Sequence, residues 1–168
     1  RFLCAHAIMF AMEGIPGLYI HSLLGTTNDY ERFENSQHNR AINRHRWQES
    51  KLLAAIEEKY SHHHQVFKGI KQLLSVRKRQ AAFHPNATQF TLHLGEGLFG
   101  FWRQSIDRQQ SIFCVYNISS QPQSLTLADL NLINTQQWVE LISNTTLDDA
   151  LQTMQLAPYQ TLWLSNKA

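Results

Sequence analysis

The hydrophobic periodicity of this chain changes once, near Phe83-His84-Pro85-Asn86, and this change constrains the fold more than any other feature. Before it, apolar residues recur at helical spacing, as at Val66, Ile70 and Leu73. Beyond it, short segments alternate between apolar and polar residues. A period of 3.6 residues places apolar side chains on one face of a helix, and a period of two places them on one face of a strand. The sequence therefore predicts two units, residues 1–84 and residues 85–168.

The second unit has the pattern of an all-β domain. Turn-rich stretches such as Gly95-Glu96-Gly97 separate its alternating segments, which cover residues 88–94, 98–103, 111–118, 123–127, 137–142 and 159–164. Short strands at regular spacing with such turns are typical of an antiparallel sandwich. Trp102, Trp138 and Trp163 lie inside these apolar segments, so we assign them to the core rather than to a sugar-stacking platform. We expect residues 85–168 to form a small antiparallel β-sandwich domain.

The first unit mixes helices with one apolar segment that resembles a strand. Helical spacing is found over residues 1–12, 49–60 and 62–80, and Ser61 stands where a cap of the last helix belongs. Residues 17–24, GLYIHSLL, are short and apolar, which predicts a buried strand. The fold class expected for this unit is α/β.

A long polar loop follows residues 17–24 and carries the candidate binding residues. It has almost no aliphatic residues, and an apolar strand that leads into such a loop is how many α/β enzymes form a site for a polyhydroxylated ligand. The candidate substrate-binding residues, which share guanidinium, carboxylate or amide groups, are Asn28, Asp29, Arg40, Asn43 and Arg44.

Charge, hydropathy and cysteine content exclude several classes of function. The net charge of +2 is too small for a nucleic-acid partner, and the basic residues form no stripe. The longest apolar run is shorter than the roughly 18 residues that span a bilayer. No signal peptide is recognisable at the start. Two cysteines, Cys4 and Cys114, form no disulfide framework, so we expect buried thiols and a cytoplasmic protein.

The nine histidines predict no metal site. His62, His63 and His64 are consecutive, and successive helical residues point about 100° apart, so they do not share one ion easily. We expect them at a solvated helix start. His21 and His45 can approach the polar loop, but no second ligand stands at a zinc-binding spacing. We therefore expect neither a metal nor another cofactor.

An ordered set of motifs resembles a known family. GIPGLYIHSLLG, then the ND pair at residues 28–29, then AINRHRW at residues 41–47, is similar to the C-terminal part of the sucrose phosphorylase subfamily of α-amylase-like retaining glycoside enzymes. The HSLLG-x-x-ND form resembles the branch that acts on glucosylglycerate more than the sucrose branch. The resemblance implies that residues 1–84 are the last helix–strand–helix portion of a TIM (β/α)8 barrel, followed by the terminal β domain.

The resemblance also implies a chemistry. Family members transfer a glucosyl unit from an α-glucoside, of the sucrose, sucrose 6-phosphate or glucosylglycerate type, to inorganic phosphate. The product is α-glucose 1-phosphate with retained configuration, and two close carboxyl groups do the work. The positions of these groups in the family precede Arg1, so we assign no catalytic residue here. The partners implied are the α-glucoside, phosphate and the missing N-terminal barrel portion, and a homo-oligomer with further copies of the protein stays an open alternative.

Individual roles follow from the same resemblance. Arg44 matches the arginine of the family's INR motif, which contacts the glucosyl unit, and its planar fork of donors suits hydroxyl oxygens. Asn43 and Arg40 would shape or extend that loop, although two arginines four residues apart are also common on a solvated helix face. Asn28 and Asp29 either contact the ligand or hold the loop by bonds to its backbone.

Three interpretations remain open from the sequence. The first is a portion of a sugar phosphorylase that is inactive when isolated from the catalytic carboxylates. The second is a non-catalytic carbohydrate-binding or interaction module derived from such an enzyme. The third is a truncated reading frame without function.

Overall fold

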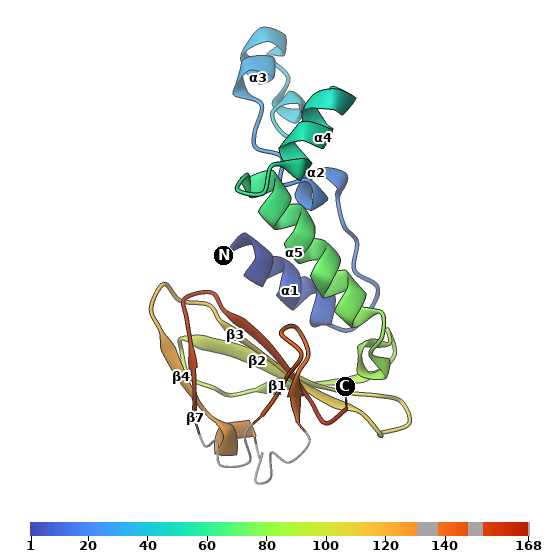
Figure 1. Cartoon of the computed structure of the whole chain (residues 1–168), viewed down its shortest axis with the longest axis vertical. Helices are drawn as coiled ribbons and strands as arrows, with labels where there is room; N and C mark the ends of the chain where they lie inside the picture. The colour runs from blue at the N-terminus through green and yellow to red at the C-terminus, as the bar shows by residue number, and fades with distance from the viewer. Residues whose placement is uncertain (131–137, 148–152, 168) are drawn as a thin grey trace. The chain divides into compact units, whose positions relative to one another are not determined.

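The computed structural model describes residues 1–130, 138–147 and 153–167 (Figure 1). The chain forms two compact units. The sheet unit contains residues 1–16 and 72–168, and the loop unit contains residues 17–71. Among the described residues, no helix has both the length and the apolar character needed to cross a membrane.

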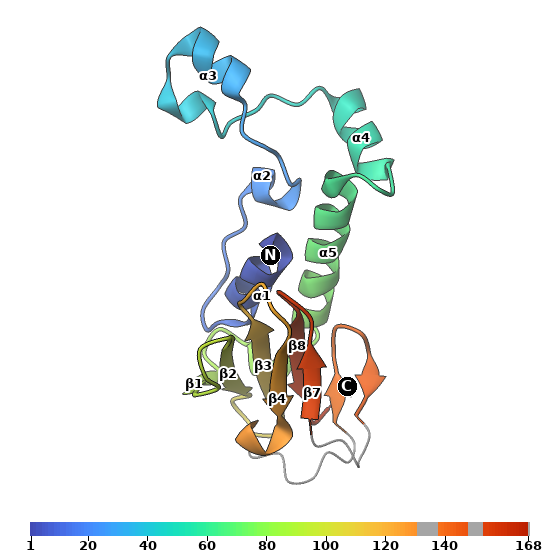
Figure 2. The same ribbon diagram turned by 90° about the vertical axis from the view of Figure 1, so that its left-hand side faces the viewer.

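Two antiparallel sheets form the body of the sheet unit (Figure 2). The larger has the order β1-β2-β3-β8-β5-β6, with bounds Thr88–Leu92, Leu98–Gln104, Ser111–Asn117, Thr161–Ser165, Val139–Glu140 and Thr145–Thr146. The smaller pairs β4 (Gln123–Thr126) with β7 (Thr153–Leu156). The six predicted strands are thus present, although residue 137 lies outside the described part of the chain. Sequence reasoning did not predict β6 and β7.

A leucine-rich core fills the space between the two sheets and confirms the predicted sandwich. Leu125 and Leu156 of the smaller sheet belong to the same buried cluster as Val115, Leu162 and Leu164 of the larger one. Alternation along β4 puts Leu125 inside while Ser124 and Thr126 stay exposed. The 3₁₀ helix η3 (Leu127–Leu130) adds two further buried leucines.

The opposite face of the larger sheet carries helix α1 (Phe2–Ala11). The Tyr116 hydroxyl donates to the Ala7 carbonyl at 3.3 Å and accepts a bond from the Trp163 indole at 3.1 Å. Trp163 is fully buried, while Trp102 and Trp138 pack partly buried against the leucine core. All three therefore have the structural role that the sequence predicts.

Two arginines bind the C-terminal end of α1. The fully buried Arg103 donates to the carbonyls of Ala11, His84 and Ala87 at 2.8, 2.9 and 3.3 Å. Arg77 donates to the carbonyls of Phe10 and Gly14. The last carbonyls of a helix lack intrahelical partners and carry partial negative charge, which suits a cation. Burial lowers the pKa of both guanidinium groups, yet bonds to carbonyls compensate for the lost solvation.

The loop unit contains only short helices apart from α5. These are α2 (Ile20–Leu23), α3 (Tyr30–Ser36), η1 (Asn39–Ala41) and α4 (Glu49–Glu57). Helix α5 (His62–Arg77) begins in this unit, and the division between the units falls within it. The predicted helices at 1–12, 49–60 and 62–80 are confirmed, with ends one to three residues earlier. Ser61 caps α5 by accepting a bond from the His64 amide at 3.0 Å.

The strand predicted over residues 17–24 is wrong. Its second half is the four-residue helix α2, and Ile20 is 53% exposed. A strand needs a neighbour to satisfy its backbone groups, and the described part of the loop unit contains no strand. Local bonds from the amides of Leu23 and Leu24 to the carbonyls of Tyr19 and Ile20 take their place, both at 3.1 Å.

The compact units do not coincide with the sequence boundary at residue 84, because α1 and the end of α5 pack with the sheets. The assignment of residues 1–84 to a barrel portion stays a prediction. A 3₁₀ turn, η2 (Ala81–Phe83), leads from α5 into β1 and buries Ala82 and Phe83.

Candidate functional site

The candidate binding residues all lie in the loop unit, between α2 and α4. Asp29 is the N-cap of α3, and its Oδ1 accepts a bond from the Arg32 amide at 3.0 Å. Its Oδ2 lies 2.7 Å from Nδ1 of His45. The Asp29 amide donates to the Ile42 carbonyl at 2.7 Å. Asp29 therefore connects the start of α3 to the segment that contains Ile42, Asn43, Arg44 and His45.

The electrostatics of Asp29 follow from these bonds. The Arg32 amide and the His45 ring both stabilise its carboxylate, so they lower the pKa of Asp29 below its ordinary value of 3.8. The side chain is ionised at neutral pH and acts only as an acceptor. His45 must consequently donate from Nδ1, which defines the tautomer of its ring.

The side chain of Arg44 is exposed to solvent, whereas its backbone is held by hydrogen bonds. The Arg44 amide donates to the Ala41 carbonyl at 3.2 Å, and the Arg44 carbonyl accepts a bond from the Arg32 guanidinium. The Arg44 side chain is exposed, and no described residue accepts a bond from its guanidinium. Its five donors are thus available to a ligand.

The other three candidates lie on the same loop with fewer contacts. Arg40 is exposed in η1. Asn43 accepts a bond from the Tyr19 hydroxyl through its carbonyl at 3.4 Å, and its side chain is exposed. Asn28 makes a 3.4 Å bond to the Tyr30 hydroxyl. Their assignment to a ligand stays a prediction.

A group of aromatic and hydroxyl side chains supports the loop, and sequence reasoning missed most of it. The Trp47 indole donates to Thr26 Oγ1 at 2.9 Å, and Nδ1 of His21 lies 3.1 Å from the same oxygen. Trp47 meets the rings of His45 and His63 edge-on, at centroid distances of 4.9 and 5.1 Å. The proximity of His21 and His45 to the loop was expected. The roles of Trp47 and Thr26 had no signal in the sequence.

The three consecutive histidines bind backbone carbonyls, each a different one. His62, His63 and His64 lie 3.0, 2.8 and 2.7 Å from the carbonyl oxygens of Gly25, Leu24 and Ile56. His63 and His64 are half-buried rather than solvated. Within the described part of the chain, no group of three potential ligands could hold a metal ion.

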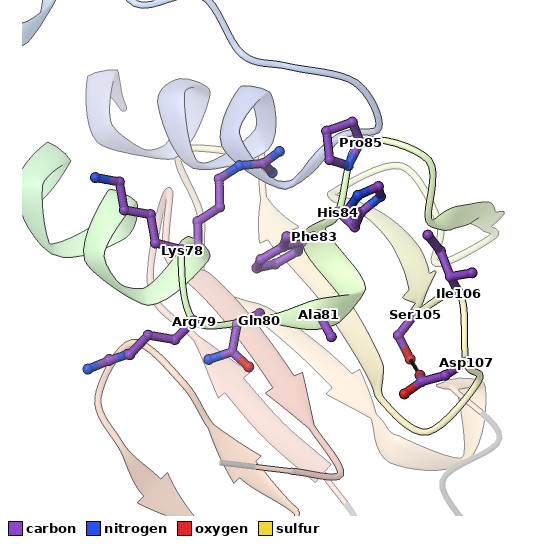
Figure 3. Close-up of a pocket in the computed structure, with 11 residues that line it drawn as sticks. Lys78, Arg79, Gln80, Ala81, Phe83, His84, Pro85, Ser105, Ile106 and Asp107 are labelled. Carbon is purple, nitrogen blue, oxygen red and sulfur yellow. Dashed lines mark hydrogen bonds between the residues drawn. The ribbon is translucent and has the colours of Figure 1, made fainter.

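A cavity of about 750 Å³ lies in the sheet unit, between the end of α5 and the β2–β3 turn (Figure 3). Phe83, Pro85 and Ile106 contribute apolar surface, whereas Lys78 and Arg79 extend away from Ser105 and Asp107. The hydroxyl of Ser105 and the carboxylate of Asp107, which both line it, already have partners. Asp107 accepts bonds from the Ser105 hydroxyl at 2.5 Å and the Gln109 amide at 3.0 Å, which lower its pKa. None of the candidate residues lines this cavity.

Comparison with known proteins gives matches over both units. Residues 81–163 match the family "Maltogenic Amylase, C-terminal domain". The chain is 35% identical to the glucosylglycerate phosphorylase of Allomeiothermus silvanus and 32% identical to that of Spirochaeta thermophila, with 98% of the chain covered in each case. These matches cover 26% and 30% of the relatives, so the chain spans less than a third of their length.

Solved structures show a similar fold. The α-amylase from Geobacillus thermoleovorans, complexed with acarbose, aligns with a TM-score of 0.69 and 12% identity. The alignment covers 98% of this chain and 32% of that one. At this identity the match concerns the fold alone, and it agrees with the antiparallel β domain.

Proposed function

We propose that this chain, a homologue of the C-terminal part of α-amylase-like phosphorylases, supplies a terminal β domain and a substrate-binding loop to a glycoside phosphorylase. The complete enzyme would transfer a glucosyl unit from an α-glucoside to phosphate and release α-glucose 1-phosphate with retained configuration. Two relatives are named for glucosylglycerate, and the HSLLG-x-x-ND motif supports the same substrate. Residues 1–84 would be the last portion of its catalytic barrel.

The observation that carries this proposal is the state of Arg44. Its guanidinium is exposed and has no acceptor among the described residues, although the backbone on both of its sides is hydrogen-bonded. A planar fork of donors on a held backbone suits the vicinal hydroxyl groups of a glucosyl unit. We place Arg44 on that unit, with Asn43 and Arg40 beside it.

The chain alone would lack the bond-breaking step. Retention requires a nucleophilic carboxylate and an acid/base carboxyl group about 5 Å apart. Both oxygens of Asp29 are already occupied by Arg32 and His45, which makes Asp29 a poor nucleophile. We therefore assign both catalytic carboxylates to the part of the enzyme outside this chain.

The carbohydrate-binding module is the weaker alternative. Sugar-binding surfaces of that kind use exposed aromatic rings as stacking platforms. Trp163 is fully buried, and Trp102 and Trp138 pack against the leucine core. Their burial favours a structural role for the β domain.

Kinetics of the full-length protein that contains this chain test the proposal. Glucosylglycerate and phosphate are the substrates, and α-glucose 1-phosphate is measured. We expect Arg44→Ala to lower kcat/KM by roughly 100-fold or more, because donors to the sugar act most strongly on the transition state. Arg44→Lys should recover little, since a point charge cannot replace the fork.

Arg46→Ala is the matched control, because Arg46 is an exposed arginine two residues away without a bonded acceptor among the described residues. It should retain near-normal kinetics. The isolated 168-residue chain, assayed in parallel, should give no product. Normal turnover by a folded Arg44→Ala enzyme would refute the role of Arg44, and turnover by the isolated chain would refute the assignment of the carboxylates.

A further inference from the structure

We propose that Asp29, Arg32 and His45 form a clamp that sets the position of Arg44 in the glucosyl site. The proposal rests on the function proposed above for Arg44. In this account Asp29 and His45 are positioning residues, which act on the ligand only through the backbone of the Arg44 segment.

The first part of the clamp holds the backbone on both sides of Asn43. The Asp29 amide binds the Ile42 carbonyl at 2.7 Å, and the Arg32 guanidinium binds the Arg44 carbonyl. Both donors come from the start of α3. The start of α3 thus holds the carbonyls of Ile42 and Arg44. Because both ends of this segment are held, its backbone has little freedom to rotate.

The second part of the clamp joins the side chains of Asp29 and His45. One carboxylate oxygen caps α3 through the Arg32 amide at 3.0 Å, and the other lies 2.7 Å from Nδ1 of His45. The edge-on contact between the rings of His45 and Trp47 also restricts the imidazole. His45 follows Arg44 directly, so fixing its ring fixes the residue after the ligand-binding arginine.

Packing within this chain contributes little to holding the segment around Arg44. All residues from Glu34 to Arg40 are exposed, and Ala41 is the one buried residue among those described between Gly25 and Trp47. Helix α3 has seven residues, and a helix this short is marginal in water. Within this chain, the bonds made by Asp29 and Arg32 therefore hold Arg44 in position.

Variants that separate the functions of Asp29 test the clamp. Serine is a good N-cap, so Asp29→Ser keeps an acceptor for the Arg32 amide while it removes the bond to His45. His45→Ala removes the same bond from the other side. The amide nitrogen of asparagine occupies nearly the position of Nδ1 in histidine, so His45→Asn restores a donor. Glu34→Gln is the control, because it removes an exposed charge from the same helix.

In the full-length enzyme, we expect Asp29→Ser and His45→Ala each to lower kcat by roughly tenfold or more, since small displacements of binding groups cost up to about 100-fold. KM should change much less, His45→Asn should recover most of kcat, and Glu34→Gln should be neutral. In the 168-residue chain, ¹⁵N NMR should show the Nδ1–H tautomer of His45, and Asp29→Ser should abolish this preference.

The outcomes separate the two proposals. Near-normal kcat for Asp29→Ser and His45→Ala, with Arg44→Ala severely impaired, would overturn the clamp and leave the proposed function standing. A His45 ring without the Nδ1–H tautomer would also overturn it. If Arg44→Ala were itself neutral, the proposed function would fail and the clamp would fail with it.

Discussion

The sheet unit and the loop unit of this protein order their chains by different means. In the sheet unit, strands pair along their length and leucines from two sheets share one core. In the loop unit, short helices are joined by side-chain bonds to backbone, and several large apolar residues are exposed, namely Tyr19, Ile20, Tyr30, Leu53 and Tyr60. Of the loop unit's residues, all of which the structure describes, only Leu24, Ala41 and Ile70 are buried, so this unit has almost no hydrophobic core of its own. We infer that the sheet unit can be stable by itself, whereas the loop unit resembles a part of a larger domain.

Arg103 offers the largest expected effect and tests the self-sufficiency of the sheet unit. Arg103→Ala would leave the buried Ala11 and Ala87 carbonyls without this donor and open a cavity under α1. Unpaired buried polar groups cost about 1–3 kcal/mol each, so the free energy of unfolding should fall by about 3 kcal/mol or more. Urea denaturation of the 168-residue chain measures this change.

Arg79→Ala is the matched control, because Arg79 is an exposed arginine of the same unit. A surface substitution of this kind should change the free energy of unfolding by less than about 0.5 kcal/mol. Equal effects of the two variants would contradict the view that Arg103 anchors α1 to the sheet unit.

Protonation of Asp29 is a smaller perturbation and concerns the loop unit. The folded pKa of Asp29 lies below its ordinary value of 3.8, so its stabilisation of the loop is complete above about pH 4. That stabilisation is lost as the pH falls through the lowered folded pKa, when the cap of α3 and the bond to His45 weaken. NMR titration of the Asp29 carboxyl carbon and of the α3 amides measures both events.

Asp107 is the control carboxylate for Asp29 in the same titration. Its pKa is also lowered, by Ser105 and Gln109, but it lies in the β2–β3 turn of the sheet unit. Its protonation should leave the α3 amides unchanged. An Asp29 carboxyl that titrates at or above 3.8 would show that the bonds to Arg32 and His45 do not form in solution.

Sequence reasoning succeeded where a local pattern decides the structure. Short apolar or alternating segments predict the strands that build the larger sheet, as in Ser111–Asn117, where every residue after Ser111 is buried. It failed at residues 17–24, where an apolar run carries no information on whether a pairing strand is present. The two-residue strand β6 carries a pattern too short to detect, and the alternation along β7, which is as long as β4, was missed.

The candidate site was predictable only in outline. Arg44 and its neighbours follow from the motifs that resemble a known family, and the comparisons confirm that resemblance. The bond between Asp29 and His45 was not predictable, because sixteen residues separate them and only the fold brings them together. The same applies to the three carbonyl bonds of His62, His63 and His64.

Amide hydrogen exchange on the monomeric 168-residue chain tests the difference between the two units most directly. We predict slow exchange in β3 and β8, which lie inside the larger sheet, and fast exchange across residues 17–24, of which only Leu24 is buried. Slow exchange across residues 17–24, comparable to that of β3, would contradict this account. It would show that the loop unit is a closed fold of its own, and it would favour a binding module over a part of a phosphorylase.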